Sequence, residues 1–164
     1  MDLMARRRQL LMIPHGIIYE GFNLDFDGTN YIDTGAYLFT EENVNRDFEF
    51  IAEGASGKRS SSNLTLICAK HNGKALGFLL RPYPWTSTAY HGTLFYDPLL
   101  KPTIVIKRKN GVISYNDDVI TNKGAIVDNG VFDWPLILGC AIDDDGTYFR
   151  YAKGHIDHVL VKWT

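Results

Sequence analysis

The pattern of hydrophobic and polar residues along the chain is typical of β-strands rather than helices. From Ile17 onward, runs of four to nine β-branched, aromatic and aliphatic residues alternate with clusters of Gly, Asn, Asp and Pro. No stretch after Gly16 has the period of a long amphipathic helix. In residues 47–52 apolar and polar side chains alternate strictly, so that Phe48, Phe50 and Ala52 share one face of a strand. We therefore expect an all-β domain.

The other predicted strands are residues 23–26, 31–32, 64–69, 77–81, 93–96, 103–109, 112–115, 136–142 and 154–163. Asn110-Gly111 joins two of them, and this dipeptide predicts a type I′ hairpin because both residues tolerate positive φ. Asn116 to Asp118 predicts a second turn. About ten to twelve short strands at this spacing are typical of a sandwich or a barrel.

Three segments, in this order, resemble the laminin-G-like, concanavalin A-like lectin superfamily. They are residues 24–35 (LDFDGTNYIDTG), the hairpin 103–116, and LILG at 136–139 followed by GHIDHVLV at 154–161. The resemblance implies a two-sheet antiparallel β-sandwich of the jelly-roll type over roughly residues 20–164. Gly139 and Gly154 are expected where a strand bends or another backbone approaches, and a bulge is expected near Asp157-His158.

Length and charge bound the class of protein. The 164 residues fit one domain at 17–164 after an arm at 1–16. With 22% charged residues and a net charge of −2, neither nucleic acid nor a membrane is expected as the main partner. Pro14 cuts the apolar run of the arm short, so we expect no signal peptide and synthesis in the cytoplasm. The two cysteines, Cys68 and Cys140, are expected to be free core thiols rather than a bridge.

Glycosidases share this sandwich, so a degenerate glycosidase is a third hypothesis. Retaining enzymes of the kind resemble one another in a Glu-x-Asp-x-(x)-Glu strand that brings two carboxylates to about 5–5.5 Å. The nearest match is residues 47–53, and it fails at Ile51. His155 and His158 are expected to point to opposite faces of a strand unless a bulge intervenes, which makes a structural role the favoured interpretation. We predict a non-enzymatic protein without a cofactor, and leave open a calcium site at Asp143 and Asp145.

Two regions are candidates for binding. Residues 82–96 are rich in aromatic residues, and the part before the strand at 93–96 is expected to form a loop. The candidates for contact with a carbohydrate or a partner protein are Tyr83, Trp85, Tyr90 and His91. Plain packing over the open end of the sandwich is the alternative. The basic arm is the second region, and its anchoring candidates are Arg6, Arg7, Arg8, Leu10 and Leu11. We expect this arm to order when it docks on a neighbouring protein.

Function is predicted from a further resemblance. Single laminin-G-like domains that begin "YIDTG" look like those in structural proteins of tailed bacteriophages, and the Arg-rich start is similar to that of some virion proteins. The first hypothesis is therefore a multi-copy virion component, such as a capsid decoration, head fibre or tail accessory. Its partners would be capsid or tail proteins and, in addition, host glycans. The alternative hypothesis is a carbohydrate-binding module or adhesin domain outside a virus.

Overall fold

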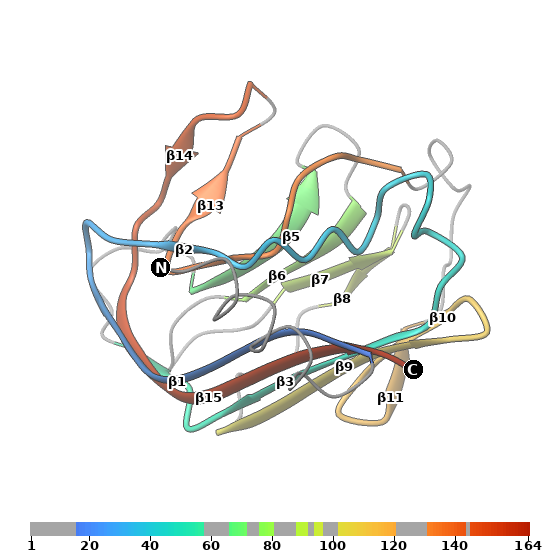
Figure 1. The fold of residues 1–164 in the computed structure, drawn as a ribbon, viewed down its shortest axis with the longest axis horizontal. Coiled ribbons are helices and arrows are strands. Elements are labelled where there is room, and N and C mark those ends of the chain that lie inside the picture. The colour runs from blue at the N-terminus through green and yellow to red at the C-terminus, as the bar shows by residue number, and fades with distance from the viewer. Residues whose placement is uncertain are drawn as a thin grey trace, which may run out of the picture.

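The computed structural model is an all-β, two-sheet antiparallel sandwich (Figure 1), which confirms the predicted fold class. It describes residues 16–57, 66–71, 76–80, 88–91, 94–96, 102–120, 131–143 and 145–164, with the backbone alone for 70–71, 76–80, 88–91, 94–96 and 118–120. These residues contain no helix, and therefore none that is long and apolar enough to cross a membrane. The predicted arm at 1–16 lies outside them, except for Gly16.

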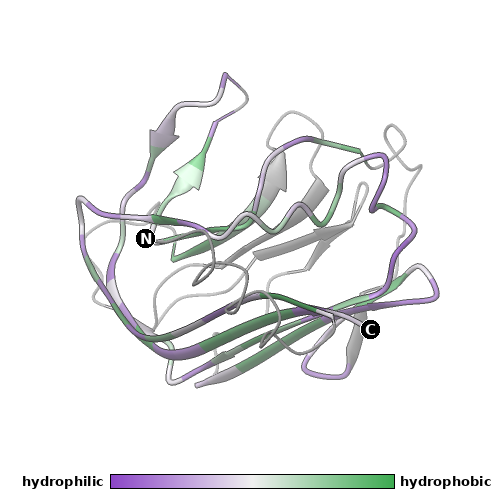
Figure 2. Ribbon diagram, in the orientation of Figure 1, coloured by the Kyte–Doolittle hydropathy of each residue, from purple (hydrophilic) through white to green (hydrophobic). Residues whose placement is uncertain are grey.

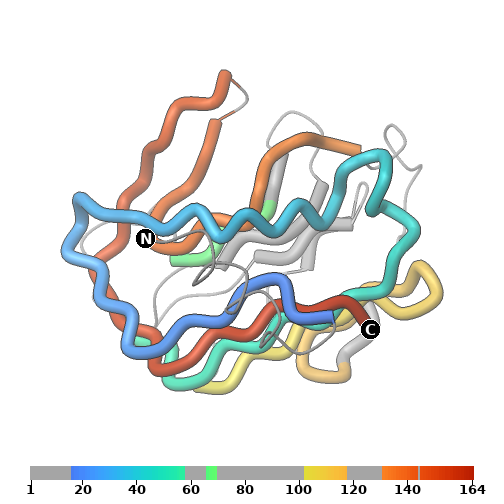
Figure 3. Tube along the Cα trace, in the orientation of Figure 1, coloured from blue at the N-terminus to red at the C-terminus, as the bar shows by residue number. Residues whose placement is uncertain are grey.

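The larger sheet has the strand order β1-β15-β3-β9-β10-β11, with β4 paired to β15. Its strands are β1 (Ile17–Asp27), β3 (Phe48–Glu53), β4 (Ser56–Gly57), β9 (Thr103–Lys109), β10 (Val112–Tyr115), β11 (Asp118–Ile120) and β15 (Lys153–Trp163). The tube in Figure 3 shows the first and last described strands, β1 and β15, running side by side. They pair antiparallel along nearly their whole length.

The second sheet faces the first and has the order β2-β12-β5-β6-β7-β8. Its strands are β2 (Ile32–Asp33), β5 (Ile67–His71), β6 (Leu76–Leu80), β7 (Thr88–His91), β8 (Leu94–Tyr96) and β12 (Ile137–Leu138). A separate hairpin, β13 (Ala141–Ile142) with β14 (Tyr148–Phe149), projects from the sandwich in Figure 1. The predicted strand 136–142 is thus two strands, because Gly139 turns the chain at φ 93°.

The core lies between the two sheets and follows the alternation seen in the sequence. Inward-facing positions of β3, β9 and β15 are fully buried, and hydrophobic residues concentrate in the strands while the turns are hydrophilic (Figure 2). Phe48, Phe50 and Ala52 point inward from β3, as predicted. Gly139 lies against the Phe26 ring, and a side chain on Gly154 would meet the backbone of β4, which confirms the expected close approaches at both glycines.

The turn predictions are confirmed where the structure describes them. Asn110 and Gly111 both have positive φ, 52° and 76°, as a type I′ hairpin between β9 and β10 requires. Asn116 and Asp117 also have positive φ, and the Asn116 side chain accepts a hydrogen bond from the Val105 backbone N–H at 2.6 Å. Strand β1 begins six residues earlier than predicted, since β15 pairs with the segment that follows Gly16.

A buried arginine fastens the segment between β2 and β3 to the core. Arg108 on β9 is only 4% exposed, and its guanidinium donates to the backbone carbonyls of Leu38, Asn43 and Arg46 at 2.8–2.9 Å. The same group lies 4.9 Å from the centre of the Phe48 ring. Burial lowers the pKa of Arg108 to about 10, and the nearby Asp47 carboxylate opposes that shift, so the side chain stays charged at neutral pH.

Candidate functional site

Of the residues predicted to make contacts, the structure describes only Tyr90 and His91. Tyr83 and Trp85 lie outside the described residues, as do the arm residues Arg6, Arg7, Arg8, Leu10 and Leu11. Tyr90 and His91, expected in a loop, belong instead to strand β7, where Tyr90 pairs with Gly77 of β6. The loop interpretation of these two residues is wrong because residues 76–80, 88–91 and 94–96 form a three-stranded meander.

A cluster of tyrosines lies where the β13–β14 hairpin meets the edge of the second sheet. The Tyr31 ring, 40% exposed, stacks on Tyr148 with ring centres 4.2 Å apart and an interplanar angle of 22°. The Tyr151 ring lies 6.3 Å from Tyr31 at a tilt of 57°. We call these three side chains the tyrosine platform. Their rings come from two distant parts of the chain: Tyr31 directly precedes β2, Tyr148 begins β14, and Tyr151 follows that strand.

The hairpin turn that carries Tyr148 is built by aspartates. The Thr147 backbone N–H donates to the Asp145 carboxylate at 2.9 Å. This bond, together with one from the Thr147 side chain, holds the pKa of Asp145 below its usual value. The backbone N–H of Asp143 bonds the Thr147 carbonyl at 2.8 Å, and Gly146 turns the chain at φ 85°. Asp144 lies outside the described residues. In the described part of the chain, no group of three or more His, Cys, Asp or Glu side chains could hold a metal ion. The calcium site stays a prediction, because its third aspartate is not described.

The platform combines uncharged rings with a nearby carboxylate. Burial and the neighbouring Tyr31 raise the pKa of Tyr148, so its phenol stays protonated at physiological pH. Asp33 is close enough to contribute to the same shift. Arg150 lies between Tyr148 and Tyr151 in sequence, at a positive φ of 55° that is unusual for a residue with a side chain. Aromatic rings beside hydrogen-bonding and charged groups are the chemistry that stacks on sugar rings and fixes their orientation.

A second cluster covers the outer face of β1, β15 and β3. His155 lies between two carboxylates, with Nδ1 2.6 Å from Asp25 and Nε2 2.7 Å from Asp157. His158 lies between Glu53 and Glu20 at 2.9 Å each. The Phe22 ring, 62% exposed, stacks on His158 at 4.7 Å. We call this set the acid–histidine face: Glu20, Phe22, Asp25, Glu53, His155, Asp157 and His158.

A local irregularity brings the two histidines to one face. The Asn23–Asp157 pair drops out of the β1–β15 register, and Asn23 has a φ of 51°. The inward residues Ile156 and Val159 are consequently three positions apart instead of two. The alternation is therefore broken near Asp157-His158 as expected, but the expected bulge is not seen, because the β1–β15 register is the same on both sides of that point.

The hydrogen-bond geometry defines the charge of both imidazoles. A neutral imidazole has one N–H, whereas each ring here has a carboxylate oxygen within hydrogen-bond distance of both nitrogens. Only the imidazolium donates to both carboxylates. These hydrogen bonds raise the pKa of His155 and of His158 above the usual value. With both imidazoles protonated, the four carboxylates still leave the face negative.

The carboxylates of residues 47–53, the nearest match to a glycosidase pattern, are bound by groups other than a substrate. The Glu49 carboxylate lies 3.6 Å from Lys107 and from Lys162, Glu53 bonds His158, and Asp47 accepts a hydrogen bond from the Asn110 backbone N–H at 2.9 Å.

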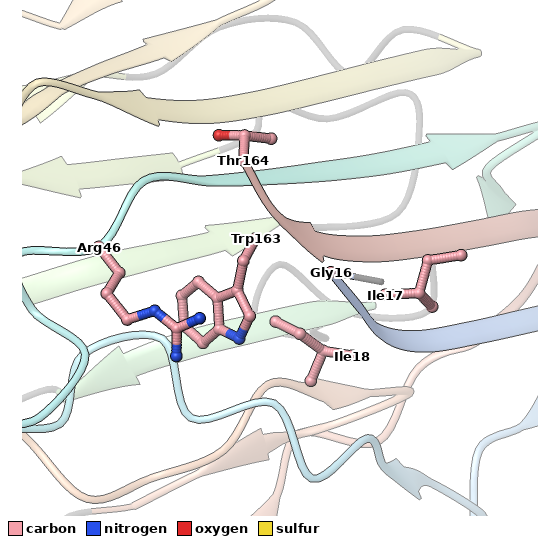
Figure 4. A pocket seen from close by; sticks show the side chains of 6 residues that line it. All are labelled: Gly16, Ile17, Ile18, Arg46, Trp163 and Thr164. Carbon is pink, nitrogen blue, oxygen red and sulfur yellow. The ribbon is translucent and has the colours of Figure 1, made fainter. Parts of the chain in front are cut away.

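A pocket of about 480 Å³ lies at the end of the sheet beside Gly16, Ile17 and Ile18. Figure 4 shows the Arg46 guanidinium over the Trp163 indole at this pocket, 4.1 Å from the ring centre.

The fold places this chain in the class of lectin-like β-sandwich domains. The CBM40 carbohydrate-binding module of the Ruminococcus gnavus IT-sialidase, bound to alpha2,3 sialyllactose, matches with a TM-score of 0.54 at 14% identity. This match covers 90% of this chain and 92% of that chain. The NanB sialidase of Streptococcus pneumoniae matches with a TM-score of 0.56 at 12% identity, and the leech intramolecular trans-sialidase with 0.54 at 15%. The chain spans only 26% of the length of these two sialidases.

The chains matched along most of their length are thus carbohydrate-binding modules, and the sialidases are matched over a fraction. The sequence matches no protein family model and none of the curated proteins. The neighbours agree with the concanavalin A-like part of the sequence resemblance, and none of them bears on the bacteriophage part.

Proposed function

We propose that this domain is a non-catalytic carbohydrate-binding module that stacks a sugar on the tyrosine platform. The observation that carries the proposal is the stack of the exposed Tyr31 ring on the half-buried Tyr148 ring, with Tyr151 beside it. A flat ring face gives a large contact with the C–H face of a pyranose, and the side chains of tyrosine lose little entropy when they are already packed on one another. The alternative hypothesis from the sequence is therefore favoured over the virion role.

Sialylated oligosaccharides are the ligands to test first. The neighbours matched along most of their length carry alpha2,3 and alpha2,6 sialyllactose. Arg150 is the cation next to Tyr151 in sequence, and its guanidinium lies 4.7 Å from the centre of the Phe149 ring. A guanidinium recognises a carboxylate by paired hydrogen bonds. Lactose, which lacks the acidic sugar, is the matched control ligand. We expect calorimetric titration to detect both sialyllactoses and to detect no lactose binding.

A pair of tyrosine variants tests the location of the site. Tyr31→Ala removes the exposed half of the stack, and the expected loss of affinity is about tenfold, or about 1.4 kcal/mol. Tyr37→Ala is the matched control, since Tyr37 is exposed to the same degree, 41% against 40%, and makes none of the platform's ring contacts. Equal affinities for the two variants would move the site away from the platform. A glycan array without any hit would refute carbohydrate binding itself.

The virion role is a second proposal with a narrower basis. It rests on the sequence resemblance of residues 24–35 and on the arginine-rich arm, and the arm lies outside the described residues. Deletion of residues 1–15 tests it, because a truncated protein that still assembles into particles would exclude anchoring through the arm. A glycan-binding sandwich is compatible with either setting, so the two proposals are tested separately.

A further inference from the structure

The acid–histidine face has an unusual composition for the solvent side of a sheet. An aromatic ring, Phe22, stands 62% exposed, while four carboxylates surround it and the two histidines. With both imidazoles protonated the face has a net charge of −2. An exposed ring inside a negative frame is complementary to a guanidinium, which stacks on an aromatic face and bonds carboxylates at its edge.

The chain itself contains a segment of that chemistry a few residues before β1 in the sequence. Arg6, Arg7 and Arg8 are consecutive, and the first 15 residues hold only one acid, Asp2. They lie outside the described residues and are followed by Gly16 and then by β1, the strand that supplies Glu20, Phe22 and Asp25. Gly16, at the start of β1, has a φ of 99°, which is typical of a turn.

The distances along the chain allow the arginines to reach the face. Eight residues separate Arg8 from Gly16, and an extended segment of that length spans roughly 26 Å. Glu20 is four residues into β1, or roughly 13 Å from Gly16 along the strand, and Asp25 is nine residues in, or roughly 30 Å. Glu20 and Phe22 are therefore within reach of Arg8, and Asp25 is within reach of Arg6. Contacts within one chain are favoured over contacts between chains, since the tether gives an effective concentration on the order of millimolar.

We propose that Arg6–Arg8 dock on the acid–histidine face of their own chain, with a guanidinium over the free side of Phe22. The docked arm neutralises the negative face and covers its exposed ring. The interaction is independent of glycan binding, because the tyrosine platform lies at the edge of the other sheet. The arm then becomes available to another protein only when high salt or a competing acidic surface releases it.

A spin label next to the arginines tests the proposal in the full-length protein. Ala5→Cys adds a thiol beside Arg6, and a nitroxide on it broadens backbone amide signals nearby. Cys68 and Cys140 are buried, and burial raises the pKa of the Cys140 thiol to about 12, so the label reacts at the new position. We expect broadening at Glu20–Asp25 and residues 155–158 in low salt, and its loss in 0.5 M NaCl.

Charge variants separate docking from mere proximity. Glu20→Gln with Asp25→Asn removes two charges from the face, whereas Glu41→Gln with Glu42→Gln removes two exposed charges elsewhere. Docking requires that the first pair abolishes the broadening and the second preserves it. Should the first pair fail to fold, Arg6→Gln with Arg7→Gln and Arg8→Gln provides the same test. Equal broadening in all variants would overturn the proposal, and so would broadening that disappears on dilution, which would indicate a neighbouring copy.

Discussion

Replacement of Arg108 by methionine is the sharpest test of how the sandwich is held together. Arg108 is 4% exposed and donates three hydrogen bonds to the carbonyls of Leu38, Asn43 and Arg46. Methionine matches its volume approximately, but all three carbonyls lose the guanidinium, and of the three the Asn43 carbonyl keeps another donor, the Arg46 backbone N–H. A hydrogen bond to a charged group contributes about 1.5–3 kcal/mol, which sets a ceiling of about 9 kcal/mol. Leu38 is buried, whereas Asn43 and Arg46 lie in a partly exposed segment whose carbonyls regain water, so we expect a loss of about 3–5 kcal/mol.

Urea unfolding measures this loss, with the midpoint converted to free energy through the slope of the transition. Lys107→Met is the matched control on the same strand. Its ammonium is 41% exposed and has one ion pair at 3.6 Å, which predicts a change within about 0.5 kcal/mol. Arg108→Lys should lie between the two, because a point charge cannot reach three carbonyls. If Arg108→Met unfolds within 1 kcal/mol of the control, the assigned anchoring role is wrong.

Two further predictions follow from the outer face and from a backbone turn. The pKa values of His155 and His158 are raised, so their stabilising bonds are complete below the unfolded value of about 6.5 and are lost as the pH rises through the folded pKa. Thermal unfolding should therefore show a decline in stability across that window, and the decline should be absent in the double variant His155→Gln with His158→Gln. Gly54→Ala should destabilise by about 1–3 kcal/mol more than Gly111→Ala. Both positions have positive φ, but only at Gly54 would the new Cβ overlap an aspartate side chain of β15; equal midpoints in urea would contradict this.

The fold was predictable where the signal is local. Asn110-Gly111 defines its hairpin through the backbone freedom of two adjacent residues, and the period of residues 47–52 assigns its inner face without knowledge of any partner. The start of β1 was not predictable in the same way. Gly21 and Asn23 weaken its strand signal, and the segment becomes a strand because β15 pairs with it from the far end of the chain.

The candidate sites depend on pairings that no local pattern contains. Tyr31 and Tyr148 meet because β2 and the β13–β14 hairpin lie at one edge of a sheet, and neither residue stands out in its own segment. His155 and His158 were recognisable as a local pair, and so was the break between them. Three of their four carboxylate partners were not, since Glu20, Asp25 and Glu53 come from the strands on either side of β15.

The adjacency of the first and last described strands has a consequence for how the domain connects to other protein. The Trp163 backbone N–H donates to the Gly16 carbonyl at 2.7 Å, so the polypeptide enters and leaves the sandwich at nearly the same point. A module with this arrangement can be inserted into a surface loop of a host protein without a long spacer on either side. It can equally be circularly permuted, with its old ends joined by a short peptide and new ends opened at the Asn110-Gly111 turn.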